Sequence, residues 1–106
     1  MLKKTDKILC VCDGGNSRSV ALAWVFKKLF DMDALSCGVR NNSRETLDIL
    51  AKWADYIVIC DKGLVSFFPE SPKVKVFDVG PDVYFKHFED RLVQKFVQYI
   101  FKEGIK

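Results

Sequence analysis

Cys12 and Arg18 are separated by five residues in a segment that reads Cys-Asp-Gly-Gly-Asn-Ser-Arg-Ser, residues 12–19. An apolar run typical of a strand precedes this segment, and an apolar run typical of a helix follows it. A loop that curls through about one turn at such a junction aims several backbone N–H groups at one point, and a guanidinium matches two oxygens of a phosphate. The segment therefore predicts a loop that binds an oxyanion.

The cysteine adds a nucleophile to this predicted anion site. The pKa of a free thiol is about 8.5, and helix N-termini and neighbouring cations lower it to about 3.5–7.5, which makes a thiolate available at neutral pH. Gly14 and Gly15 let the backbone approach a ligand closely, and the Ser19 hydroxyl can cap the helix or bond to the sulfur. We therefore expect Cys12 to be a nucleophile. The alternative is a glycine-rich turn in which the cysteine is merely buried.

Length and composition limit the remaining function classes. The 106 residues predict one domain, 1–106, and the apolar and charged fractions, 49% and 29%, are those of a soluble globular protein. The net charge of +3 is too small to indicate a nucleic-acid partner. Charges interrupt every apolar run well before the roughly 18 residues of a membrane span. We expect a cytoplasmic monomer with no nucleic-acid or membrane partner.

The chain has four cysteines, of which Cys10, Cys37 and Cys60 fall within predicted strands. In a cytoplasmic protein these positions favour reduced core thiols over disulfides, and their spacing does not suggest zinc. A redox partner for Cys12 stays open between Cys60 and Cys10. Cys60 is the better candidate if its strand lies beside the first one.

Strand-like and helix-like segments alternate along the chain, which predicts an α/β fold with right-handed crossovers and a parallel sheet. The expected strands are 7–11, 34–39, 54–60 and 73–77, and the expected helices are 19–30, 44–54, a short turn at 63–70, and 86–102. Trp24 should be a core residue, Asn42 or Ser43 should cap the second helix, and Gly104 should end the last one. Arg40 and Arg44 are expected to be solvated surface residues.

The spacing Cys12-x5-Arg18-Ser19, directly after residues 7–11, resembles the signature of the low-molecular-weight protein tyrosine phosphatase family. This resemblance implies a three-layer α/β sandwich with a four-stranded parallel sheet of order 2-1-3-4, flanked by helices. It also implies that Cys12 attacks phosphorus, Arg18 binds the equatorial oxygens and Ser19 assists the thiolate. The residues expected to contact the phosphate are Asp13, Gly14, Gly15, Asn16, Ser17 and Ser19.

The loop departs from the family pattern at two places. Ser17 stands where many relatives have a second cysteine, so the protective disulfide within the loop cannot form. Asp13 places a negative charge beside a site for anions, which is compatible with substrate binding only if its side chain points away.

The segment 78–84 should supply the acid of the reaction. Ligands gather outside the carboxyl ends of parallel strands, so this segment and the Cys12 loop should share one edge of the sheet. A phosphocysteine route needs a proton donor for the leaving oxygen and then a base for water, and one carboxyl serves both steps. The family places an aspartate near a proline and an aromatic residue here. We therefore assign the acid to Asp82, keep Asp78 as the alternative acid, and expect Tyr84 to stack on an aryl phosphate.

These features favour a phosphatase for phosphomonoesters, with protein phosphotyrosine indicated by the family resemblance alone. Its partner would be a phosphorylated protein or a small phosphoester, and the chemistry requires no cofactor and no metal. Three alternatives stay open: a cysteine-phosphorylated phosphocarrier of the sugar phosphotransferase type, an arsenate reductase, and a non-catalytic phosphopeptide binder. The carriers lack an arginine equivalent to Arg18, and arsenate reduction needs a resolving thiol.

Overall fold

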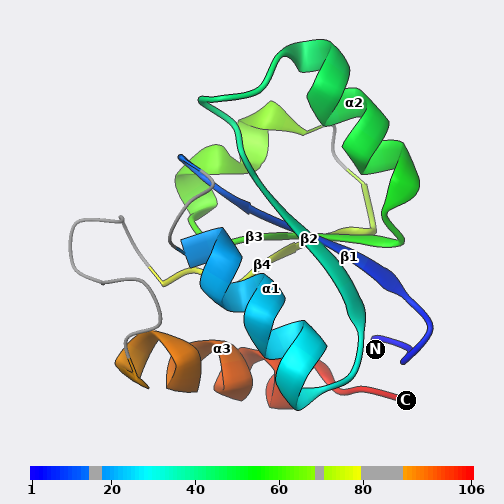
Figure 1. The fold of residues 1–106 in the computed structure, drawn as a ribbon, viewed down its shortest axis with the longest axis vertical. Coiled ribbons are helices and arrows are strands. Elements are labelled where there is room, and N and C mark those ends of the chain that lie inside the picture. Colours follow the sequence, from blue (N-terminus) through cyan, green and yellow to red (C-terminus); the bar gives the residue numbers. More distant parts are fainter. Residues whose placement is uncertain (15–17, 69–70, 80–89) are drawn as a thin grey trace.

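The structure is a computed structural model that describes residues 1–14, 18–68, 71–79 and 90–106. Strands and helices alternate along the chain in the predicted order (Figure 1). The elements are β1 (Lys7–Cys12), α1 (Arg18–Leu29), β2 (Asp33–Gly38), α2 (Arg44–Trp53), β3 (Tyr56–Ile59), the 3₁₀ helix η1 (Lys62–Phe67), β4 (Val74–Val76) and α3 (Asp90–Glu103).

The strands form one parallel sheet of four strands in the order β2-β1-β3-β4. The parallel topology expected from the alternation and the strand order implied by the family resemblance are both confirmed. In the register of the sheet, Val11 on β1 lies opposite Cys37 on β2 and Ile59 on β3. The central strand β1 therefore ends between two neighbours, and the segments that follow all three strands emerge at the same edge.

The side chains of β1 alternate between two apolar clusters, one on each face of the sheet. Ile8, Cys10 and Cys12 belong to the cluster that α1 and α3 cover, whereas Leu9 and Val11 belong to the cluster beneath α2 and η1. Figure 1 shows α1 and α3 on one side of the sheet and α2 on the other. This alternation follows from the two-residue period of an extended strand, and it produces three layers.

The last helix packs through one stripe of apolar residues. Leu92, Phe96 and Ile100 are fully buried, and each contributes about 1.5–3 kcal/mol through burial. The helix ends before Gly104, which has a φ of 86° and donates its N–H to the Ile100 carbonyl. The predicted end of this helix is confirmed, whereas residues 86–89 of the expected range lie outside the described residues.

Two local expectations have clear outcomes. Ser43 caps α2, because its hydroxyl accepts a hydrogen bond from the Thr46 N–H at 3.1 Å. Asn42 instead donates its side-chain N–H to the Gly38 carbonyl. The prediction that Trp24 is a core residue is wrong, since 38% of it is exposed. Its neighbours Leu22 and Val25 occupy the face of α1 that packs into the core, whereas Trp24 lies on a more exposed face of the helix.

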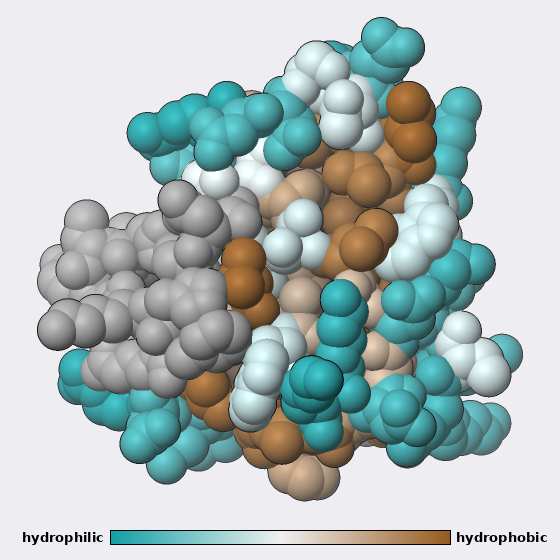
Figure 2. Space-filling view, in the orientation of Figure 1, coloured by the Kyte–Doolittle hydropathy of each residue, from teal (hydrophilic) through white to brown (hydrophobic). Residues whose placement is uncertain are grey.

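The surface is mostly polar, with an apolar band along the middle of the face in Figure 2. Large apolar side chains that are exposed include Leu35 on the edge strand β2 and Ile49 on α2. In the part of the chain that the structure describes, none of the helices is both long and apolar enough to cross a bilayer.

Candidate active site at the carboxyl edge of the sheet

Cys12, Arg18 and Ser19 meet where β1 ends and α1 begins. Cys12 is the last residue of the strand, and Arg18 and Ser19 are the first two residues of the helix. Among the residues that the structure describes, Arg18 and Ser19 are the buried polar ones, with 1% and 0% of their surfaces exposed. A fully buried arginine is rare without a compensating partner, so the start of α1 is a specialised environment.

The Cys12 thiol contacts the Ser19 hydroxyl. The Sγ and Oγ atoms lie 3.1 Å apart, and the thiol donates this hydrogen bond while it carries its proton. When the sulfur is ionised, the same distance lets the hydroxyl donate to it. Because α1 begins at Arg18, Ser19 lies inside the first turn and not at the capping position. Of the two expected uses of its hydroxyl, the contact with sulfur is the one that the geometry supports.

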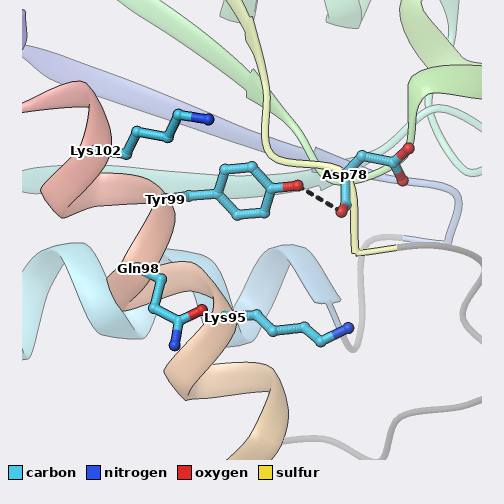
Figure 3. Close-up of a pocket in the computed structure, with 5 residues that line it drawn as sticks. All are labelled: Asp78, Lys95, Gln98, Tyr99 and Lys102. Carbon is cyan, nitrogen blue, oxygen red and sulfur yellow. Dashed lines mark hydrogen bonds between the residues drawn. The ribbon is translucent and has the colours of Figure 1, made fainter.

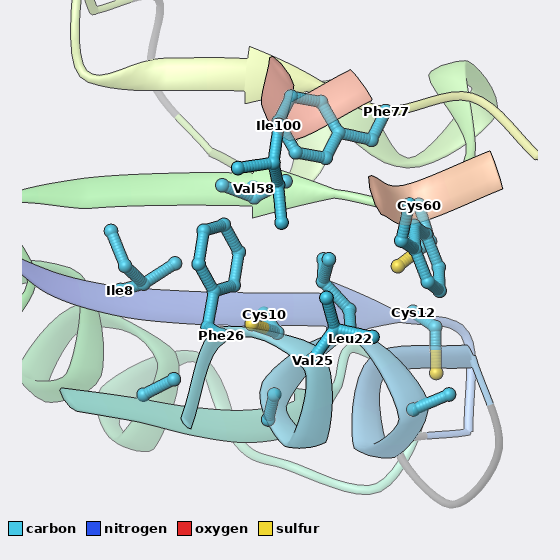
Figure 4. Packing of buried hydrophobic residues seen from close by; sticks show 14 of the residues in the cluster. Ile8, Cys10, Cys12, Leu22, Val25, Phe26, Val58, Cys60, Phe77 and Ile100 are labelled. Atoms are coloured by element: carbon cyan, nitrogen blue, oxygen red, sulfur yellow. The ribbon is translucent and has the colours of Figure 1, made fainter. Parts of the chain in front are cut away.

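The Cys12 side chain is fully buried and belongs to the apolar cluster beneath α1. Figure 4 shows it at the end of β1 beside Leu22 of α1, with Cys60 near the end of the neighbouring strand. The thiol thus has an apolar environment on one side and the Ser19 hydroxyl on another. Cys12 is therefore a fully buried thiol with a polar partner, whether it acts as a nucleophile or is a structural residue.

The guanidinium of Arg18 pairs with Asp61. Arg18 Nη1 lies 3.5 Å from Asp61 Oδ2, and the other carboxylate oxygen, Oδ1, accepts the N–H of Gly63 at 2.9 Å. Asp61 thereby caps η1 and balances the charge of a buried arginine. This role of Asp61 was not predicted from the sequence. The available signal was its position directly after a buried strand, at the ligand-binding edge.

The first two loop residues after Cys12 contact the segment that follows β2. The Asp13 carboxylate forms an ion pair with Arg40, and the Gly14 carbonyl accepts the side-chain N–H of Asn41 at 2.6 Å. Arg40 is exposed, as expected of a surface residue, but it is also part of the loop's support. Gly15, Asn16 and Ser17, which were expected to contact phosphate, lie outside the described residues.

Of the two candidate acids, the structure describes only Asp78. Its backbone carbonyl accepts the Tyr99 hydroxyl at 2.8 Å, and its carboxylate points away from α3 (Figure 3). Asp78 borders a cavity of about 360 Å³ whose other lining residues, Lys95, Gln98, Tyr99 and Lys102, lie on α3. Asp82 and Tyr84 lie outside the described residues, so both assignments stay predictions.

The other cysteines occupy the interior of the sheet, and all four carry reduced thiols. Burial is the main cause that raises the pKa of Cys10 well above its ordinary value. Burial, and then the charge of Cys12, raise the pKa of Cys37 to about 11. Thiols with raised pKa values stay protonated at neutral pH and are poor nucleophiles.

Cys60 occupies a different position from these two. It follows β3, one residue past the pair that joins Val11 to Ile59, and its N–H donates to the Val11 carbonyl at 2.9 Å. Cys60 therefore follows the strand that neighbours β1, and it belongs to the same apolar cluster as Cys12. The condition for preferring Cys60 as a redox partner, a strand beside the first one, is met.

No family model matches the chain, and no match was found among the curated proteins or the solved structures. The function is therefore inferred from the residues at the carboxyl edge of the sheet.

Proposed function

We propose that this protein is a cysteine-dependent phosphatase that hydrolyses phosphomonoesters through a phosphocysteine on Cys12. The observation that carries the proposal is the contact of the Cys12 thiol with the Ser19 hydroxyl, next in sequence to a buried arginine. The Ser19 hydroxyl lies 3.1 Å from the sulfur, and the Arg18 guanidinium is almost fully buried in the same turn. This arrangement supports membership of the low-molecular-weight protein tyrosine phosphatase family.

An anion is the ligand that this turn would stabilise best. The first N–H groups of α1 have no partner within the helix, and they carry the positive end of its dipole. Arg18 adds a guanidinium, which pairs with Asp61 at 3.5 Å and whose planar fork matches the oxygens of a phosphate. The site follows the central strand of a parallel sheet, where ligands of such folds gather.

The proposed reaction has two steps. The Cys12 thiolate forms a bond to phosphorus while the bond to the leaving oxygen breaks, and the acid gives its proton to that oxygen. A water molecule then attacks phosphorus, gives a proton back to the carboxylate, and releases inorganic phosphate as the S–P bond breaks. Arg18 binds the non-bridging oxygens in both steps, and Ser19 stabilises the sulfur when it leaves as a thiolate.

The finer assignments rest on the family resemblance. Asp82 is proposed as the acid, with Asp78 as the alternative, and such an acid contributes roughly 10²–10⁴-fold to the rate. Tyr84 is proposed to stack on the substrate, which favours aryl phosphates such as phosphotyrosine. An Asp82→Asn variant should lose the falling limb of the pH–rate profile at high pH, whereas an Asp78→Asn variant should keep it. The reverse result would move the acid to Asp78.

Hydrolysis of an aryl phosphate tests the proposal directly. The wild-type protein should release the phenol, and Cys12→Ser should be inactive while its circular dichroism spectrum and melting temperature stay close to those of the wild type. Phosphate or vanadate should protect Cys12 from alkylation by iodoacetamide. A wild-type protein that releases no phenol and gains no protection from either anion would show that Cys12 is a structural thiol.

Arsenate reduction is the second candidate, because Cys60 directly follows β3, donates its N–H to the Val11 carbonyl and belongs to the same apolar cluster as Cys12. In that reaction the Cys12 thiolate first forms a bond to the arsenic of arsenate, while one As–O bond breaks and its oxygen leaves, after protonation, as water. The Cys60 thiolate then attacks the Cys12 sulfur, arsenite leaves with the electron pair of the S–As bond, and a Cys12–Cys60 disulfide remains for an added dithiol to reduce. Production of arsenite that disappears in Cys60→Ser would favour this reaction over phosphate hydrolysis, which should continue in the same variant.

A further inference from the structure

Residues 39–41, which follow β2, lie beside residues 12–14, the first part of the proposed anion loop (residues 12–19). The Val39 N–H donates to the Cys12 carbonyl at 3.1 Å, and the Arg40 N–H donates to the Asp13 carbonyl at 3.0 Å. The Asn41 side chain donates to the Gly14 carbonyl at 2.6 Å. Three consecutive carbonyl groups of the loop are therefore held on the side of β2.

Asp13 creates an electrostatic problem for an oxyanion site. It directly follows the proposed nucleophile, and a carboxylate there repels a bound phosphate and disfavours a thiolate. The structure pairs this carboxylate with the Arg40 guanidinium, which lies on the side of β2. Arg18 is paired on the opposite side, with Asp61 after β3. The loop is thus flanked by two ion pairs, one toward each neighbouring strand.

We propose that Arg40 is a positioning residue for the anion loop. It holds the Asp13 carboxylate on the β2 side and offsets its charge, which reduces the repulsion between Asp13 and a bound anion. Asn41 completes this support by donating a hydrogen bond to the Gly14 carbonyl. The inference rests on the proposed function, because it assigns Arg40 a role only if an oxyanion binds in this loop.

The exposure of the pair separates this role from a role in folding. The side chains of Arg40 and Asp13 are 73% and 34% exposed. An ion pair so accessible to water contributes little to stability. Loss of Arg40 should therefore leave the melting temperature almost unchanged and weaken the binding of anions.

Arg44 offers a matched control. It is also an exposed arginine after β2, with 51% of its side chain accessible, and it pairs with Asp48 on α2 at 2.8 Å. Arg44→Ala removes the same charge at a similar place in the sequence without touching the loop residues that are described. A general effect of surface charge on phosphate binding would appear in both variants.

The experiment measures the dissociation constant of inorganic phosphate by calorimetry at low ionic strength, together with kcat and KM for an aryl phosphate. We expect Arg40→Ala to raise the phosphate dissociation constant about three- to tenfold, with KM rising more than kcat falls. The effect should shrink in about 1 M salt, because screening weakens exposed charges. Arg40→Lys should stay within about twofold of the wild type, since it keeps the charge.

The double variant Asp13→Asn/Arg40→Ala shows whether Arg40 acts by offsetting the charge of Asp13 or only by supporting the structure of the loop. If Arg40 acts on the charge of Asp13, removing that charge should restore phosphate binding to within about twofold of the wild type. Equal binding by Arg40→Ala and Arg44→Ala, or a loss that the double variant does not restore, would overturn the proposal. A wild-type protein that binds no phosphate would instead overturn the proposed function, and this inference with it.

Discussion

Cys10 and Cys12 lie on the same face of the same strand, both are fully buried, and their surroundings differ. Cys10 lies in the interior of the sheet, where burial raises the pKa of its thiol well above the ordinary value. Cys12 lies at the end of the strand, where its sulfur meets the Ser19 hydroxyl at the start of α1. Cys10 is thus a poorly reactive buried thiol, whereas Cys12, two residues further along β1, has a polar partner.

The surroundings of the two cysteines differ because Cys12 is the last residue of β1, whereas Cys10 lies inside the strand. Inside the sheet, backbone groups pair with neighbouring strands, and side chains meet apolar partners. At the carboxyl edge, the first turn of α1 supplies N–H groups that have no partner within the helix, together with Arg18 and Ser19. An α/β sheet therefore places its reactive groups where strands become helices.

The largest expected effect separates the two cysteines themselves. Cys12→Ser should reduce the hydrolysis of an aryl phosphate on the order of 10⁴-fold or more, because a hydroxyl without a strong base is a poor nucleophile. Cys10→Ala should keep near-normal kcat and lose only about 1–2 kcal/mol of unfolding free energy, from the sulfur removed in the core. Activity that falls equally in both variants, at matched fractions of folded protein, would remove the distinction between the two thiols.

Arg18→Lys tests whether the start of α1 binds an anion. Lysine keeps the charge but loses the planar fork, so kcat/KM should fall about 10²–10³-fold. Steady-state kinetics and a urea titration would measure activity and unfolding free energy separately. A lysine variant with wild-type kcat/KM would mean that Arg18 has only a structural role in pairing with Asp61.

Substitution of Asp61 should lower kcat/KM less than Arg18→Lys does. Asp61→Asn keeps a side chain that caps η1 well, but it removes the charge that faces Arg18 at 3.5 Å. We expect kcat/KM to fall about tenfold through misplacement of the guanidinium, and the unfolding free energy to fall by about 1–3 kcal/mol because the buried Arg18 loses a charged partner. Asp61→Ala should in addition lose about 1 kcal/mol of unfolding free energy, because the cap is gone. Equal kcat/KM for Asp61→Asn and the wild type would exclude a positioning role.

The smallest effect concerns the interior thiols at high pH. The pKa of Cys37 is raised to about 11 in the folded protein, above its ordinary value, so the folded state holds a proton that the unfolded state releases. The unfolding free energy should therefore fall as the pH rises from about 9 to about 11. Cys37→Ala should show a weaker decline in urea titrations over this range. A decline as steep as that of the wild type would assign the pH dependence to other groups.

Local patterns account for most of the elements. The crowding of β-branched residues predicted β3, the alternation of elements predicted a parallel sheet, and Gly104 predicted the end of α3. Trp24 was placed wrongly because almost every turn of α1 carries apolar residues, so the pattern alone does not tell which face meets the sheet. Only packing selects that face.

The candidate site also combines residues that the sequence indicated with residues that only the fold brings to it. Cys12, Arg18 and Ser19 were identified from the sequence because they are close along the chain, and their spacing fixes their geometry around one turn. Asp61 and Arg40 were not identified, because each reaches the loop from a different strand. Which strands become neighbours is decided by long-range packing, and no local pattern encodes it.

The sequence by itself therefore determined the class of fold and placed Cys12, Arg18 and Ser19 at the junction of β1 and α1. The tertiary structure alone decided what surrounds these residues: one ion pair on each side of the loop, and Cys60 in the same apolar cluster as Cys12. The physical reason is that charges and thiols interact over a few ångströms of space. Parallel strands bring such distances about between residues that are more than 25 positions apart in the chain.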